Sequence, residues 1–146
     1  VVVSHAACRS LVETPRNLSD DQLRALVERG GVLGLMLLPI VIDPDNPTVA
    51  RAIDHLDHAV EVMGIEHVGL GGDFIRQVFR ATIVHTPPDS LLPHGMPMDA
   101  AIDDVAGPED YPAFVAALRA RGYTGARLDA VLAGNFLRVL QHALPA

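Results

Sequence analysis

Three polar residues in this chain follow apolar runs that have the character of buried strands. His5 comes after the run at 1–4, Arg16 lies in the loop that follows, and Asp73 comes after a later strand and Gly71-Gly72. In parallel α/β folds, functional side chains gather at the carboxyl ends of the strands. An imidazole at such an end can ligate a metal, a guanidinium matches a carboxylate, and an aspartate can act as a base or a ligand.

Each of these residues also has a structural explanation. His5 could be hydrogen-bonded at a loop start, and Arg16 could be a surface arginine paired with Asp20 or Asp21. Asp73 could cap a turn or a helix. The residues alone leave these alternatives open.

The elements that would position them alternate between strand and helix. Strands are expected at 1–4, 32–38 and 67–70, because these runs are apolar and carry no polar alternation. Apolar spacing and end signals predict helices at 19–29, 48–63, 111–121 and 128–142, the first opened by a capping box of Ser19 and Gln22. Residues 39–47 are expected to form a loop.

This order predicts an α/β fold of parallel βα units. We expect one segment over 1–146, in which 1–73 holds three strands and two helices. A long proline-containing loop or lid follows at 74–110, and 111–146 forms the closing helices.

The remaining histidines and the cysteine are weaker candidates. His55 and His58 lie one helical turn apart and could bind a surface metal, but a solvated helix face is the favoured interpretation. His85 and His94 fall in the long loop and are expected to be exposed. Cys8 is interpreted as a packing residue.

Composition excludes several classes of protein. The 146-residue chain has a formal charge of −7, which argues against nucleic acid as a partner. Its longest apolar run, at 31–42, is too short to cross a bilayer. The single cysteine excludes an internal disulfide and fits a reducing, cytoplasmic location.

Several blocks of the chain resemble one known family. The first is Ser-His-(x)3-Arg at 4–9 with Pro-Arg-Asn-Leu-Ser-Asp-Asp-Gln-Leu at 15–23. The second is Ile-Asp-His-Leu-Asp-His at 53–58 with Gly-Ile-Glu-His-Val-Gly-Leu-Gly-Gly-Asp-Phe at 64–74. Short closing motifs follow at 110–112, 121–123 and 134–139. In this order the blocks are similar to the C-terminal part of renal (membrane) dipeptidases, zinc metallopeptidases of the amidohydrolase superfamily; only 75–100 falls outside the likeness.

The resemblance implies a TIM-type (β/α)8 hydrolase barrel, incomplete in this chain, that hydrolyses dipeptides with two zinc ions. It implies that His5 is a metal ligand, that Arg16 binds the substrate's terminal carboxylate, and that Asp73 is a catalytic residue beside the metals. The other metal ligands would lie before Val1, so the missing N-terminal part of the barrel is an expected partner. A homodimer is a further expectation.

Two other functions stay open. Another amidohydrolase reaction, such as lactone or N-acyl hydrolysis, is possible on the same barrel, although Arg16 suits a carboxylate better than a neutral lactone. The chain could also be a catalytically incomplete fragment or a degenerate relative. At 73–76 it reads Asp-Phe-Ile-Arg, where the family often has Asp-Phe-Asp-Gly, and this departure bears on substrate preference more than on the reaction.

Overall fold

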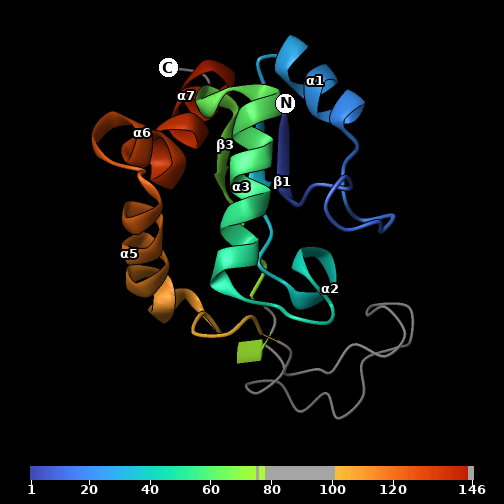
Figure 1. Ribbon diagram of the computed structural model, residues 1–146. Coiled ribbons are helices and arrows are strands. Elements are labelled where there is room, and N and C mark those ends of the chain that lie inside the picture. Colours follow the sequence, from blue (N-terminus) through green and yellow to red (C-terminus); the bar gives the residue numbers. More distant parts are fainter. Residues whose placement is uncertain (75, 78–100, 145–146) are drawn as a thin grey trace.

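The computed structural model of the chain describes residues 1–74, 76–77 and 101–144. Within them, three parallel strands form one sheet in the order β1-β2-β3 (Figure 1). The predicted α/β fold with adjacent parallel strands in chain order is therefore confirmed. A closed barrel is not seen in the described residues, because β1 and β3 each pair only with β2.

The strands differ in length from the sequence prediction. β1 covers Val2–Ala6, β2 covers Val32–Leu35 and β3 covers Val68–Leu70. β1 therefore continues through His5, where a loop was expected, and β2 ends three residues early. Beyond β2 the chain still follows the sheet, because the amide of Met36 donates to the Ala6 carbonyl at 2.9 Å and that of Leu37 to the Gly72 carbonyl at 3.0 Å.

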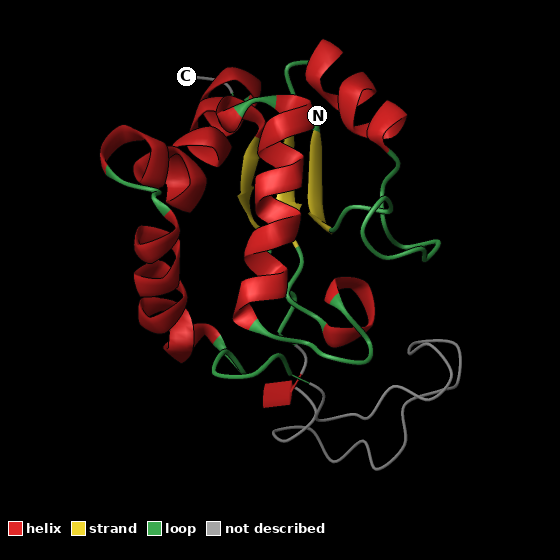
Figure 2. Cartoon of the chain, in the orientation of Figure 1, coloured by secondary structure: helices red, strands yellow, loops and turns green. Residues whose placement is uncertain are grey.

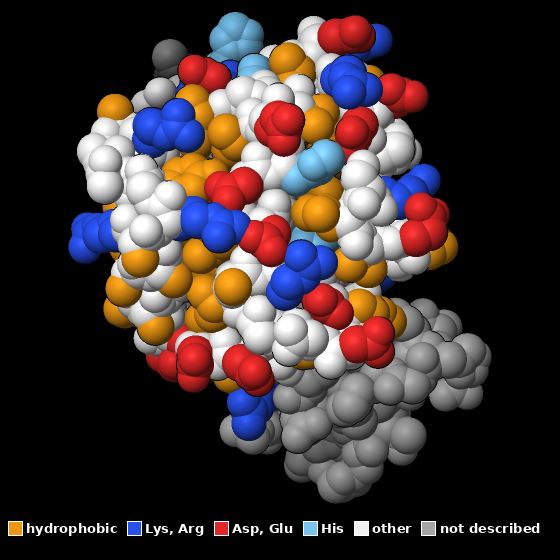
Figure 3. Space-filling model, in the orientation of Figure 1, with side chains coloured by type: hydrophobic (Ala, Val, Ile, Leu, Met, Phe, Trp, Pro, Cys, Tyr) orange, Lys and Arg blue, Asp and Glu red, His pale blue; other side chains and the backbone are white. Residues whose placement is uncertain are grey.

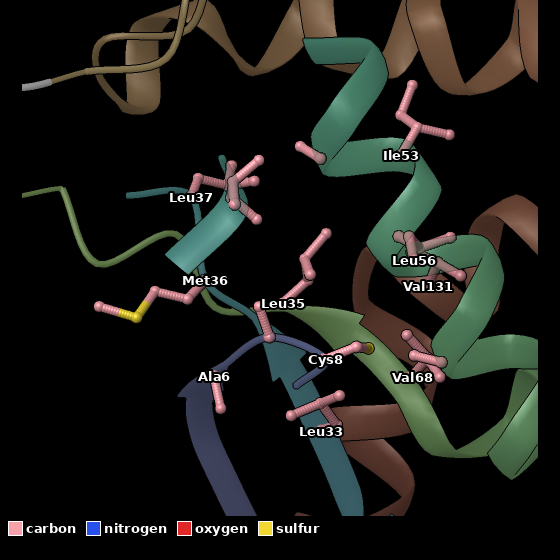
Figure 4. Packing of buried hydrophobic residues seen from close by; sticks show 14 of the residues in the cluster. Ala6, Cys8, Leu33, Leu35, Met36, Leu37, Ile53, Leu56, Val68 and Val131 are labelled. Carbon is pink, nitrogen blue, oxygen red and sulfur yellow. The ribbon is translucent and has the colours of Figure 1, made fainter. Parts of the chain in front are cut away.

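Two amphipathic helices bury their apolar faces on one side of the sheet. α1 covers Asp20–Glu28 and starts with the predicted capping box of Ser19 and Gln22. α3 covers Val49–Met63, starts at the N-cap Thr48 and ends at Gly64, whose φ of 84° suits glycine. Figure 4 shows how Ile53 and Leu56 of α3 pack against the buried side chains of the sheet. The labelled residues of this cluster are Ala6, Cys8, Leu33, Leu35, Met36, Leu37, Ile53, Leu56, Val68 and Val131.

A short helix, α2 at Pro39–Ile42, occupies part of the segment that was predicted as a loop. Pro39 stands in its first turn, where the missing N–H of proline costs no hydrogen bond. Val41 and Ile42 are fully buried. The loop prediction was wrong here because four residues are too few to show a helical period.

The C-terminal helices are α5 at Tyr111–Arg121, α6 at Gly125–Asp129 and α7 at Asn135–Ala143, and a π-helical turn, η3, at Ala130–Gly134 joins the last two. Two 3-10 turns lie earlier in the chain than the C-terminal helices: η1 at Ile65–His67 comes directly before β3, and η2 at Pro108–Asp110 comes directly before α5. Figure 2 shows η3 and α7 beside β3 and α5 beside α3, and α7 ends near the N-terminus of the chain. The side chain of Asn135 donates to the carbonyls of Ile65 and Val68, both at 2.7 Å, and so fixes α7 to the start of β3.

Polar side chains join α3 to the closing helices. Arg121 donates to Asp57 at 2.7 Å and also pairs with Asp54, and the hydroxyl of Tyr123 donates to Asp57 at 2.6 Å. On the face drawn in Figure 3, acidic and basic side chains are interspersed, with no single-sign patch. No helix in the described residues is both long and apolar enough to cross a membrane.

Candidate active site

His5 lies in a β-bulge near the carboxyl end of β1. Val3 pairs with Leu33 and Ala6 pairs with Leu35, so Ser4 and His5 together oppose the single residue Gly34. A bulge places two residues where a regular strand has one, and it redirects their side chains. The imidazole of His5 is exposed, and its Nδ1 lies 2.8 Å from the Ser4 hydroxyl. When Nδ1 carries the proton and donates to this hydroxyl, the Nε2 lone pair is free for a metal.

Asp73 follows Gly71-Gly72 at the carboxyl end of β3. The Gly71 amide donates to the Leu35 carbonyl at 2.9 Å, which continues the sheet past β3. Asp73 itself has a φ of 56°, in the left-handed region that aspartate tolerates better than most residues. Its side chain is half-buried.

The bulge in β1 and the segment after β3 meet across the sheet. A Cβ on Gly71 would overlap the carbonyl oxygen of Ser4, although β2 separates the two strands in the sheet order. The residue before His5 thus touches the residue two before Asp73. The segments that carry His5 and Asp73 therefore lie at the same, carboxyl end of the sheet.

Arg16 lies on the loop that leaves the same end of β1, and its side chain is exposed. The predicted alternative partners are engaged elsewhere: Asp21 pairs with Arg24 at 3.0 Å, and Asp20 binds Ser10 and His58. Within the described part of the chain, no hydrogen bond or ion pair joins Arg16 to His5 or Asp73. The three residues therefore share one end of the sheet, and only His5 and Asp73 are linked through neighbouring contacts.

A metal centre is not complete within these residues. Among the described positions, no group of three or more His, Cys, Asp or Glu side chains could hold a metal ion. A catalytic zinc needs about three protein ligands, and His5 offers one imidazole nitrogen. The described residues can therefore contribute to a zinc site but do not form one.

The prediction that His55 lies on a solvated helix face, and the alternative that it binds a surface metal, are both wrong. His55 is fully buried, its Nδ1 accepts from the Cys8 amide at 3.1 Å, and its Nε2 lies 2.9 Å from the Ile42 carbonyl. Burial is the main cause that lowers the pKa of His55 below its ordinary value. His55-Leu56-Asp57 also has the spacing of a His-x-Asp metal motif, but on a helix these two residues point apart, and Asp57 pairs with Arg121.

The other weak candidates are placed as follows. Cys8 is buried, and burial, followed by the nearby charge of Asp20, raises the pKa of its thiol to about 12, as expected for a packing residue. His58 is half-buried and lies 2.9 Å from Asp20. His85 and His94 lie outside the described residues.

Sequence reasoning missed Asn17 as a buried polar residue. Its side chain is fully buried and donates to the carbonyls of Val12 and Val41, at 3.0 and 2.8 Å. The only signal in the sequence was its position between Arg16 and an apolar Leu18 in a loop, which does not distinguish a buried asparagine from an exposed one.

The three-stranded parallel sheet and the helices that alternate with its strands define an α/β protein. Residues 1–81 match the membrane dipeptidase family (peptidase family M19), and the chain belongs to this family.

Individual relatives agree with this assignment. Dipeptidase verJ of Clonostachys rogersoniana is 31% identical over 140 residues, which are 96% of this chain and 31% of the relative. An uncharacterised protein in the pqqA 5′ region of Klebsiella pneumoniae is 32% identical in an alignment of 148 positions that covers 97% of this chain and 46% of that protein. The chain thus spans about a third to a half of the length of these relatives.

The fold is shared with solved structures. A metallopeptidase from Rhodobacter sphaeroides, liganded with a phosphinate mimic of the dipeptide L-Ala-D-Ala, matches with a TM-score of 0.77 at 24% identity. The match covers 98% of this chain and 36% of that structure.

Proposed function

We propose that this chain is the C-terminal part of a zinc-dependent dipeptidase built on a (β/α)8 barrel. The observation that supports it most is the contact of Ser4 with Gly71, which joins the segments that carry His5 and Asp73, in a member of the membrane dipeptidase family. On this proposal, β1, β2 and β3 are consecutive strands of the barrel, and the unpaired edges of β1 and β3 join strands that the described residues do not include.

Each of the three residues has a distinct role in the proposed site. His5 supplies one imidazole ligand, and two zinc ions held there with ligands from outside the described residues would supply hydroxide near neutral pH. Arg16 binds the terminal carboxylate of the substrate through its planar fork, which restricts the site to short peptides with a free C-terminus. Asp73 orients the attacking oxygen and carries its proton to the leaving amine.

The position of Arg16 argues for a dipeptide over a neutral ester. Its side chain is exposed on the loop at the carboxyl end of β1, and neither Asp20 nor Asp21 neutralises it. A guanidinium beside a hydrolytic site can pair with the carboxylate of a dipeptide, whereas a neutral lactone has no anionic group for it to bind. Dimerisation of the complete enzyme is also part of the proposal.

A chimera tests the proposal directly. Residues 1–146 replace the matching 36% of the Rhodobacter sphaeroides metallopeptidase, so that the remaining ligands come from the host. We expect the chimera to hydrolyse L-Ala-D-Ala in the presence of zinc, and we expect His5→Ala and Asp73→Asn to reduce kcat by about a hundredfold or more.

A folded chimera with bound zinc that cleaves no dipeptide would contradict the proposal. It would favour a degenerate relative. Cleavage of lactones or N-acyl amino acids in place of dipeptides would favour the other amidohydrolase reactions.

A further inference from the structure

Two fully buried polar side chains hold adjacent carbonyl groups of α2. Asn17 donates from Nδ2 to the Val41 carbonyl at 2.8 Å, and the Nε2 of His55 lies 2.9 Å from the Ile42 carbonyl. Because Nδ1 of His55 accepts from the Cys8 amide, its Nε2 carries the proton and donates. One side chain comes from the loop after β1 and the other from α3, so α2 is held from both sides.

The same asparagine closes the loop that carries Arg16. Its Nδ2 also donates to the Val12 carbonyl at 3.0 Å, and its backbone carbonyl accepts from Nε of Arg9 at 3.0 Å. At the base of the loop, the Leu18 amide donates to Ala7 at 2.9 Å and the Arg9 amide donates to Leu18 at 2.8 Å. Arg16 therefore precedes a residue whose backbone and side chain are both fixed.

The far end of these hydrogen bonds is anchored to the frame of the active site. α2 begins three residues after Met36, and the amides of Met36 and Leu37 donate to Ala6 and Gly72. Ala6 directly follows His5 in the chain, and Gly72 directly precedes Asp73. A displacement of α2 would thus change the distance between the Arg16 loop and the other two site residues.

We propose that Asn17 and His55 are positioning residues that set the reach of Arg16 toward the substrate carboxylate, by fixing its loop to α2. The inference deepens the proposed function and depends on the role of Arg16 in it. The competing explanation is that both side chains only satisfy buried carbonyls and stabilise the whole domain.

Hydrogen exchange of the 146-residue chain separates these explanations without any activity. Asn17→Ala and His55→Leu each remove the donor to α2, whereas in His55→Gln an amide can both accept from Cys8 and donate to Ile42. We expect the amides of Arg9 and Leu18 to exchange at least about tenfold faster in the first two variants. The sheet amides of Leu37 and Gly71 should be unchanged, and His55→Gln should restore protection.

Exposed His142 provides the matched control, and His142→Gln should alter neither set of amides. Equal acceleration of loop and sheet amides in both donor-removing variants would mean that these residues stabilise the domain as a whole. That result would overturn the proposal, as would unchanged loop amides.

The catalytic consequence is measured on the chimera as the ratio of kcat/KM for L-Ala-D-Ala to that for its C-terminal amide. Arg16→Ala should abolish the preference for the free carboxylate. Asn17→Ala and His55→Leu should lower it by about tenfold or more, mostly through KM for the acid, with kcat for the amide retained and with rescue in His55→Gln.

The two failures are distinguishable. If Arg16→Ala keeps the preference, the proposed role of Arg16 is wrong, and the exchange experiment still decides whether the loop is fixed to α2. If Arg16→Ala loses the preference while Asn17→Ala and His55→Leu keep it, the positioning role is wrong and the dipeptidase proposal stands.

Discussion

The carbonyl oxygen of Ser4 lies directly over Gly71, in the position that a side-chain carbon on Gly71 would need. The bulge in β1 and the segment after β3 can approach each other only because Gly71 has no Cβ. Since His5 follows one partner and Asp73 lies two residues beyond the other, the contact determines the spacing of two candidate catalytic groups.

We therefore expect Gly71→Ala to lower the free energy of unfolding by about 1–3 kcal/mol, because a backbone atom cannot move aside as a flexible side chain can. Urea denaturation measures this change. Gly30→Ala is the matched control, since Gly30 has a φ of 63° and open space around it, so that only backbone strain of about 1 kcal/mol is expected. An effect of Gly71→Ala no larger than that of the control would show that the contact relaxes without cost.

Stability on the acid side should depend on His55. Burial, assisted by the nearby charges of Arg51 and His58 and opposed by Asp54 and the hydrogen bond to Ile42, holds its pKa below the ordinary 6.5. At a pH between the lowered pKa and 6.5, His55 is protonated in the unfolded chain but not in the folded chain. This contribution to stability is present above about pH 6.5 and is lost as pH falls toward the lowered pKa.

Urea denaturation at pH 7.5 and 5.5 checks this expectation. His55→Gln should lose less stability between the two pH values than the parent chain. The same pH dependence in both proteins would show that another group is responsible.

Stability on the alkaline side should depend on Tyr123, whose pKa is raised by folding. Burial first, and then the hydrogen bond to Asp57, raise the pKa of this phenol above its ordinary value. Its contribution to stability is complete below about pH 10 and is lost as pH rises through the raised pKa. Tyr123→Phe should lower stability at pH 8 by about 1 kcal/mol and flatten the loss above pH 10. Tyr111, present in both proteins, provides the common background in an absorbance titration.

The 146-residue chain alone should show negligible dipeptidase activity. His5 and Asp73 cannot hold two zinc ions, and the described residues contain no larger group of ligands. Purified chain is assayed with zinc and a simple dipeptide, beside the chimera at equal concentration. Turnover comparable to that of the chimera would show that this chain contains ligands that we have not recognised.

Much of the fold follows from patterns that sequence preserves over many residues. The apolar spacing in 48–63 predicted α3 to within one residue, and Ser19 with Gln22 predicted the start of α1. α2 was missed because four residues carry no period. His55 was misassigned to the solvated face because it lies beside the predicted apolar stripe, and the sequence does not show that its ring finds two buried backbone partners. The Ser4–Gly71 contact depends on a bulge, which no local pattern signals.

The isolated chain should also associate in solution. Val1, Val2, Leu137, Leu140 and Leu144 expose between 41% and 69% of their surface. β1 and β3 each have one edge without a partner among the described strands. Exposed apolar surface and unpaired edges promote association. Light scattering at micromolar concentration should detect it, and Leu137→Glu with Leu140→Glu should reduce it. A strictly monomeric parent chain would contradict this expectation.

The π-helical turn at Ala130–Gly134 has a consequence for insertions and deletions in the family. A π turn is equivalent to one residue added to an α-helix, and it rotates everything that follows by about 100°. Asn135 reaches the carbonyls of Ile65 and Val68 only with that rotation. A chain that lost one residue here would keep a longer, more regular helix yet direct the asparagine away from β3. We therefore expect relatives to keep the number of residues in this turn more strictly than the identity of those residues.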